Sequence, residues 1–184
     1  VWLHTIDNDL LSVSLFDSRF KDAIVEVATD TTSRRTWING DASETGIELE
    51  LQKALTTHWS SRLGLMHLFD KPADINSQAT TLLSGSLVYQ AERWLGSVHS
   101  YFQGARRDPI DIDQRADTEE FLPIGGRAVV GLFGSYQWDP QIAVFAGIDN
   151  ALDRKYISPA QRYDNVQGVP ERGRTGTLGV RWDY

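Results

Sequence analysis

The sequence predicts an all-β fold, an antiparallel up-and-down meander of about eight strands, and two features of the chain predict it. The first is a period of two in hydrophobicity. In residues 177–184 the apolar Leu178, Val180 and Trp182 alternate with polar residues or glycine, which places them on one face of a strand. The second is that the connections between such segments alternate between short and long. None of these segments has the spacing of an amphipathic helix.

The same alternation defines each predicted strand in turn. The strands are residues 9–28, 35–55, 58–69, 78–90, 93–105, 123–138, 140–152 and 174–184. Their alternating residues are, in order, Leu11, Val13, Leu15; Ile47, Leu49, Leu51; Trp59, Leu63, Leu65; Leu83, Gly85, Leu87, Tyr89; Trp94, Val98, Phe102; Ala128, Val130, Leu132, Tyr136, Trp138; Ile142, Val144, Ala146, Ile148; and Leu178, Val180, Trp182, Tyr184. One face of the predicted sheet is therefore apolar and the other polar.

The connections favour a membrane barrel over a soluble sandwich. Residues 56–58, 91–93 and 139–140 form short turns, whereas residues 29–43, 70–77, 104–123 and 153–173 form long polar segments. Short turns at one end and long loops at the other are typical of outer-membrane barrels. A soluble β-sandwich would show more even spacing, and loops of about twenty residues are uncommon in compact soluble domains.

Aromatic residues on the apolar face are sorted to the short-turn end. They are Trp59, Tyr89, Trp94, Tyr136, Trp138, Trp182 and Tyr184. Phe69 and Phe102 lie about ten residues further along their strands, which at about 3.3 Å per residue and a tilt of roughly 40° is a rise of about 25 Å, the height of an apolar band. We therefore expect a membrane-interface belt at one depth, and the bacterial outer membrane as the location.

Composition limits the function classes. The chain has 184 residues, enough for one domain, and its formal net charge of -7 argues against nucleic-acid binding. Cysteine is absent, and no apolar run is long enough for a membrane-spanning helix. The chain begins at Val1 without a signal peptide, so we expect a mature product or a fragment.

Several motifs resemble TonB-dependent outer-membrane receptors. Leu15-Phe16-Asp17 with Lys21-Asp22-Ala23-Ile24, and Trp37-Ile38-Asn39-Gly40 leading to Thr45-Gly46-Ile47-Glu48, resemble two successive strands of that family. Residues 147–156, Gly-Ile-Asp-Asn-Ala-Leu-Asp-Arg-Lys-Tyr, are similar to its "Asn-Leu-Phe-Asp-Lys-x-Tyr", with Ala151-Leu152 where Leu-Phe is usual. Gly173-Arg174-Thr175 matches the "Gly-Arg-Thr" that opens the last strand. Thr177, Gly179, Trp182 and Tyr184 match the terminal signal read by the barrel assembly machinery, with Tyr where Phe is commonest.

The resemblance implies that residues 1–184 are a C-terminal section, about the last eight strands, of a barrel of about 22 strands. The plug domain and the earlier strands would be absent from this chain. The family imports scarce nutrients such as iron-siderophore complexes, haem or cobalamin, and TonB drives it through the plug. Two alternatives remain: a complete small eight-stranded outer-membrane barrel with a structural or adhesion role, and a soluble β-domain that binds sugars or proteins.

Residues with specific chemistry are few. His4, His58, His67 and His99 lack metal-ligand spacing, so we expect no metal and no cofactor. Glu48 and Glu50 share a face, but charged residues are expected in a barrel lumen, so we expect no enzyme activity. The candidate substrate contacts are His67, His99, Tyr101, Arg106, Arg107 and Arg115. The arginines lie in a long loop and could bind an anionic siderophore or lipopolysaccharide phosphates, the alternative being a plain solvated loop.

Overall fold

A computed structural model describes residues 2–6, 9–28, 35–71, 78–110, 120–158 and 169–183. Its main element is one nine-stranded antiparallel sheet with the order β1-β2-β3-β4-β5-β6-β9-β10-β13. The strands are β1 (Trp2–Ile6), β2 (Asp9–Ala28), β3 (Arg35–Ala54), β4 (Trp59–Asp70), β5 (Thr81–Gln90), β6 (Trp94–Gln103), β9 (Arg127–Gln137), β10 (Ile142–Asp149) and β13 (Thr175–Trp182). Two small hairpins pair β7 (Arg106–Ile110) with β8 (Glu120–Ile124), and β11 (Ile157–Ser158) with β12 (Val169–Pro170).

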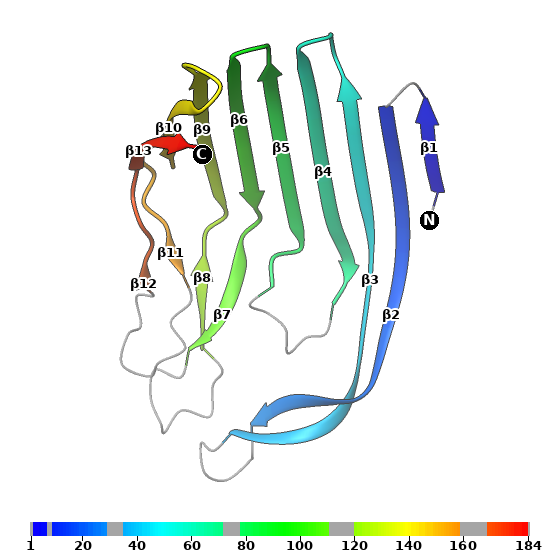
Figure 1. Cartoon of the computed structure of the whole chain (residues 1–184). Helices are drawn as coiled ribbons and strands as arrows, with labels where there is room; N and C mark the ends of the chain where they lie inside the picture. Colours follow the sequence, from blue (N-terminus) through cyan, green and yellow to red (C-terminus); the bar gives the residue numbers. More distant parts are fainter. Residues whose placement is uncertain are drawn as a thin grey trace.

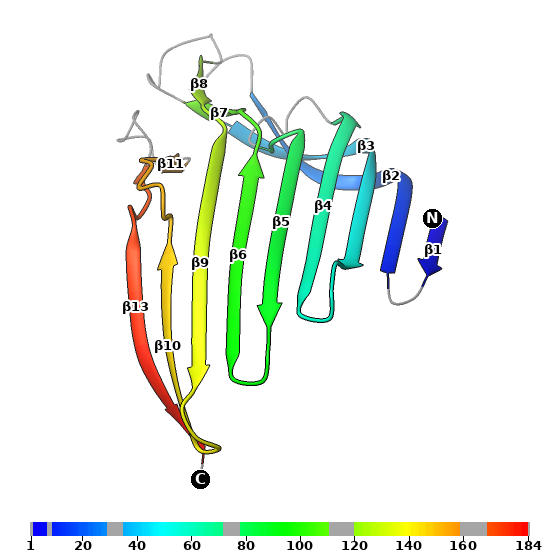
Figure 2. The same cartoon turned by 90° about the horizontal axis from the view of Figure 1, so that it is seen from above.

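The sheet is a curved, open meander. Strands that follow one another along the chain lie side by side, and β1 and β13 lie at opposite edges (Figures 1 and 2). Within the described residues β1 pairs only with β2, and β13 only with β10. The predicted all-β meander is thus confirmed. No helix in the described part of the chain is long and apolar enough to cross a bilayer.

The prediction of eight strands missed β1. Its five residues, Trp2–Ile6, are too few to show a clear period of two, and His4 interrupts the apolar positions. β1 nevertheless pairs along its whole length with β2, from Trp2 opposite Val13 to Ile6 opposite Asp9. The chain therefore enters the sheet one strand earlier than the sequence predicted, and β1 runs toward the short-turn end.

Most large apolar side chains of the described residues are exposed. Within the described residues, the buried apolar side chains are Leu68, Ala79, Ile124 and Ala143. In contrast, Leu178 is 84% and Trp182 68% exposed. An apolar surface of this extent on a protein in water would be exceptional, because burial of such side chains drives folding. It indicates that another apolar phase covers the sheet.

The two ends of the sheet differ. The connections β3–β4, β5–β6 and β9–β10 are tight, whereas β7–β8 and β11–β12 extend from the other end (Figure 1). The β2–β3 hairpin extends furthest. It bends at a register shift between Phe20 and Ala23, where Asp22 has a φ of 54° and its backbone N–H donates to Asp41 Oδ1 at 3.4 Å. Beyond this bulge the hairpin turns toward β7–β8 in both views (Figures 1 and 2).

Candidate functional site

Away from the register shifts in β2 and β3, strand register assigns the described side chains of the sheet to one of two faces. Leu51 pairs with Leu63, Leu63 with Gly85, Gly85 with Ser100, and Ser100 with Val130. Because paired residues share a face and alternate residues change face, these pairs fix the assignment for that part of the sheet. The face of Leu51 carries most of the leucines, valines and aromatic residues, and we call it the apolar face. The opposite, polar face carries Glu48, Glu50, Arg62, His99 and Asp149.

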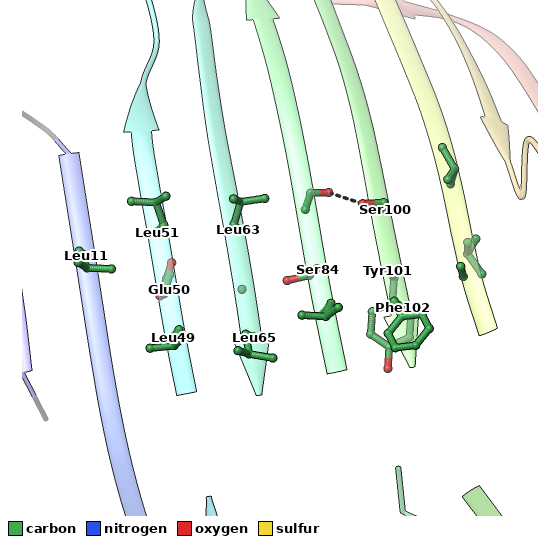
Figure 3. A pocket seen from close by; sticks show the side chains of 16 residues that line it. Leu11, Leu49, Glu50, Leu51, Leu63, Leu65, Ser84, Ser100, Tyr101 and Phe102 are labelled. Atoms are coloured by element: carbon green, nitrogen blue, oxygen red, sulfur yellow. Dashed lines mark hydrogen bonds between the residues drawn. The ribbon is translucent and has the colours of Figure 1, made fainter. Parts of the chain in front are cut away.

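A shallow groove crosses the apolar face where small residues interrupt the leucine rows. Its lining includes Gly85 and Ser100 together with Leu63, Leu83 and Phe102, and Figure 3 shows leucines of neighbouring strands around it. Ser100 Oγ lies 3.5 Å from the carbonyl oxygen of Gly85, so the local backbone accommodates its hydroxyl. With leucines from several strands around it, the groove presents hydrocarbon to its surroundings. It suits acyl chains better than a polar ligand.

The predicted belt aromatics form ring pairs on the apolar face. Trp59 is the register partner of Tyr89, and their ring centroids are 5.0 Å apart. Trp94 is the partner of Tyr136 at 4.5 Å. Trp138 contacts Tyr136 edge-on at 6.4 Å. Trp182, opposite Ile142, continues the series on β13, and Tyr184 lies outside the described residues.

From β4 to β13 these aromatics lie progressively nearer the short-turn end of the sheet. Tyr89 pairs with Gly96, so Trp94 lies two residues nearer the short-turn end than the row of Trp59 and Tyr89. Tyr136 pairs with Val144 and Val144 with Val180, so Trp182 lies two residues lower again. From β4 to β13 the aromatics shift by four residues along the strands, at about 3.3 Å per residue, while the sheet advances by five inter-strand steps of about 4.8 Å. A strand tilt of about 30° therefore brings all of them to one depth. Strands of outer-membrane barrels tilt by roughly 35–45°.

One transverse row of the polar face holds polar contacts at both of its ends. Gln52, Arg62, Ser86 and His99 are successive register partners. Arg62 Nη2 donates to Gln52 Oε1 at 2.9 Å, and Arg62 Nε lies 3.5 Å from Glu50 Oε1. Further along the row His99 Nε2 lies 3.8 Å from Asp149 Oδ1, across the intervening Gly131.

Glycines show that side chains crowd the polar face. A Cβ at Gly131 would lie 2.0 Å from His99 Nε2, one at Gly179 would lie 2.3 Å from Phe145, and one at Gly46 would lie 2.6 Å from Phe16. On the apolar face, a Cβ at Gly96 or Gly176 would meet nothing within 4 Å. Side chains converge on the inner face of a curved sheet and diverge on the outer one. The polar face is therefore the inner face.

The sheet separates the candidate substrate contacts. His99 and Tyr101 lie on the polar face of β6, two residues apart. His67 lies on the apolar face, where its Nδ1 is 2.8 Å from Thr81 Oγ1 and its ring 5.7 Å from that of Phe69. His67 therefore does not join His99 in one site. Arg106 begins β7, whereas the side chain of Arg107 and the whole of Arg115 lie outside the described part of the chain.

The structure adds Arg127 and Glu171, which sequence reasoning missed. Arg127 is the register partner of Gln103, at the long-loop end of the polar face. Its Nη1 lies 2.5 Å from Glu171 Oε1, and its guanidinium carbon lies 5.6 Å from the centre of the Tyr101 ring. The pair joins residues 44 positions apart, so no local pattern in the sequence could have indicated it.

The motif at residues 147–156 ends β10 and hydrogen-bonds the part of β9 that β10 does not reach. Asn150 is 5% exposed with a φ of 48°, and its side-chain amide bonds both backbone groups of Arg154. Beyond β10 the Tyr156 hydroxyl accepts from the backbone N–H of Ala128 at 3.1 Å and donates to its carbonyl. Asp153, with a φ of 51°, accepts from the backbone N–H of Arg174 at 2.9 Å. The motif thus satisfies backbone groups of β9 at Ala128 that have no partner in β10.

The family model "TonB dependent receptor-like, beta-barrel" matches residues 2–151. The chain belongs to the TonB-dependent receptor family. Proteins with this barrel are bacterial outer-membrane proteins, and the sheet described above is an outer-membrane sheet, with its apolar face toward lipid. A comparison of the sequence with curated proteins gives no match.

Solved structures of this kind have the same fold. The ferripyoverdine receptor of the outer membrane of Pseudomonas aeruginosa, bound to ferripyoverdine, superposes with a TM-score of 0.79 at 17% identity over 96% of this chain and 25% of that chain. The FrpB iron transporter from Neisseria meningitidis gives 0.73 at 19% identity, over 98% and 30%. The copper transporter OprC gives 0.75 at 19% identity, over 99% and 30%. The chain thus spans less than a third of the length of these receptors and transporters, none of which is named as an enzyme.

Proposed function

We propose that the chain forms the C-terminal barrel section of a receptor that imports a scarce nutrient, an iron-siderophore complex, haem or a similar chelate, across the outer membrane. The observation that carries the proposal is the open sheet with one lipid-suited face and one polar inner face. The backbone groups along the free edges of β1 and β13 need partners, because a bilayer offers none. Further strands of the same barrel are the natural partners.

The partners of such a receptor follow from family membership. We infer that TonB supplies energy through a plug domain, and that the barrel assembly machinery reads Thr177, Gly179, Trp182 and Tyr184. The side chains of Trp182 and Leu178 are among the most exposed of the apolar face. This exposure leaves the last strand available for recognition before it pairs with another strand.

Iron chelates are the first substrate class to test. Two of the similar structures are named for iron or a ferric chelate, and one for copper. The polar face presents His99, Tyr101, Arg62 and Arg127. Cationic and aromatic groups of this kind suit an anionic chelate better than a bare cation. We propose no catalytic activity for these residues.

The test is uptake by the full-length receptor in a strain that lacks its other receptors. Cells are given radioactive iron as several chelates and as haem, and radioactive copper, with TonB present or deleted. We expect TonB-dependent uptake of at least one iron compound. A matched strain would carry the receptor with an Arg substitution at Leu87 on the lipid face, which should fail to assemble. Uptake of copper alone would replace iron in the proposal, and uptake of nothing would favour the small structural barrel.

A further inference from the structure

The strongest feature outside the transverse row is a cluster at the long-loop end of the polar face. It consists of Tyr101, Gln103, Arg106, Arg127, Ser158 and Glu171, and we call it the Arg127 cluster. β6 and β9 bring Gln103 and Arg127 opposite each other. Ser158 and Glu171 come from the segment around β11 and β12, which returns to the sheet at this point.

Glu171 holds the segment onto β9. Its Oε1 accepts from Arg127 Nη1 and from Ser158 Oγ, each at 2.5 Å. The side chains of Arg127 and Glu171 are 29% and 25% exposed, compared with 62% and 46% for the Arg62–Glu50 pair. The Arg127–Glu171 pair is therefore the better shielded of the two, and its attraction is less weakened by solvent.

The cluster also has two enclosed donors and one enclosed acceptor that its own groups leave unused. Arg127 Nε, Arg106 Nε and Gln103 Oε1 are enclosed but have no partner within the described residues. An enclosed polar group without a partner costs about 1–3 kcal/mol. The guanidinium of Arg127 thus binds Glu171 through Nη1 while its Nε stays without a described partner, and the ring of Tyr101 supports this guanidinium.

We propose that the Arg127 cluster is an anion-exchange site, at which a carboxylate of the imported chelate replaces Glu171 on Arg127. An incoming bidentate carboxylate can use both Nε and Nη of a guanidinium, whereas Glu171 uses only Nη1. Displacement of Glu171 also frees the β11–β12 segment from β9, so that ligand binding and loop release are linked. This inference rests on the proposed function, since it names the chemistry of the substrate: a chelate with peripheral carboxylates.

The test measures binding and loop release in the purified full-length receptor, without TonB. The probes are ferric citrate, which carries carboxylates, and a neutral ferric trihydroxamate. Glu171→Gln removes the internal competitor and should raise ferric citrate affinity about threefold to tenfold. Arg127→Gln should lower it at least about tenfold, since a hydrogen bond to a charged group is lost. Glu50→Gln is the matched control on the same face and should change it less than twofold.

A spin label at Val169→Cys in β12 reports loop release, and this chain offers no other cysteine. Ferric citrate should increase the mobility of the label in the natural sequence, and Glu171→Gln should do so without any ligand. Arg127→Lys, which keeps the charge but loses the forked geometry, guards against misfolding of Arg127→Gln and should still weaken binding. Unchanged citrate affinity in Glu171→Gln, or equal effects in the Glu50 and Glu171 variants, would overturn the proposal. If the receptor imports a chelate but gives either of these results, the proposed function stands and only the exchange site is refuted.

Discussion

The imidazole ring of His99 lies over Gly131, its register partner on the next strand, and reaches Asp149 on the strand beyond. Only glycine permits this, because a Cβ at position 131 would lie 2.0 Å from Nε2 and 2.2 Å from Cε1 of the ring. The inner face of the sheet therefore depends on glycine for a contact that links three strands.

Gly131→Ala should displace His99 and break its contact with Asp149. Overpacking of this kind costs about 1–3 kcal/mol, which thermal unfolding of the full-length receptor in detergent would measure. Gly96→Ala is the matched control, because a Cβ there meets nothing within 4 Å. The double variant His99→Ala with Gly131→Ala should recover most of the loss. Equal destabilisation by Gly131→Ala and Gly96→Ala would contradict the crowding argument.

Arginine substitutions should distinguish the two faces. Leu49, Leu87 and Val144 lie on the apolar face, and Arg there should cost about 2–4 kcal/mol near the bilayer midplane. The same substitution at Glu48 or Ser86, on the polar face, should cost far less. The measurement is the folding free energy of the full barrel in lipid vesicles. Similar costs on both faces would invalidate the assignment of the lipid face.

How much the sequence could predict depends on whether a feature is local. The alternation in β13 and the other full strands predicted the two faces, because side-chain direction in a strand follows from residue parity alone. β1 was missed because five residues carry too weak a period. The sequence could predict that Trp94 and Tyr136 lie at a similar depth, but not that they pair. Their register is set between residues 42 positions apart, and neither segment alone determines it.

The candidate site was less predictable than the fold. His67 belongs to the apolar face by parity, so its separation from His99 could have been predicted from the sequence. Arg127 and Glu171 meet through the return of the segment after β10, and no sequence pattern indicates where such a segment lands. The motif at residues 147–156 was identified only by resemblance. Its physical role, in which Tyr156 bonds the backbone of Ala128, becomes clear from the structure.

Tyr156→Phe should destabilise the barrel through the edge of β9. It removes the hydroxyl that serves both backbone groups of Ala128, and unsatisfied backbone groups cost about 1–3 kcal/mol each when enclosed. We expect lower thermal stability and faster hydrogen exchange at Ala128. Tyr136→Phe is the control, since its ring contact with Trp94 does not use the hydroxyl. No difference between the two variants would argue against this role.

Loss of the terminal aromatics should reduce assembly of the receptor. Deletion of residues 182–184, or Tyr184→Asp, removes an interface anchor and, by family membership, part of the signal for the barrel assembly machinery. Synthesis should be unchanged while the folded, heat-modifiable form in the outer membrane declines. Thr175→Ser, at the other end of β13, should leave levels normal. Normal outer-membrane levels of the deletion variant would mean that this end is an ordinary edge strand.

Residues 1–184 expressed alone should not form a sealed barrel. Tilt and stagger are tied to strand number, so a section of a wide barrel keeps the curvature of the wide barrel. The edges at β1 and β13 would then stay unpaired, which lipid does not tolerate. We expect aggregation or degradation in cells, and no protease-resistant species after refolding into vesicles, whereas the full-length receptor should give one. A monomeric, heat-modifiable, protease-resistant product with cross-links between Leu11 and Leu178 would show that the two edge regions can close on each other, and would favour the small-barrel alternative.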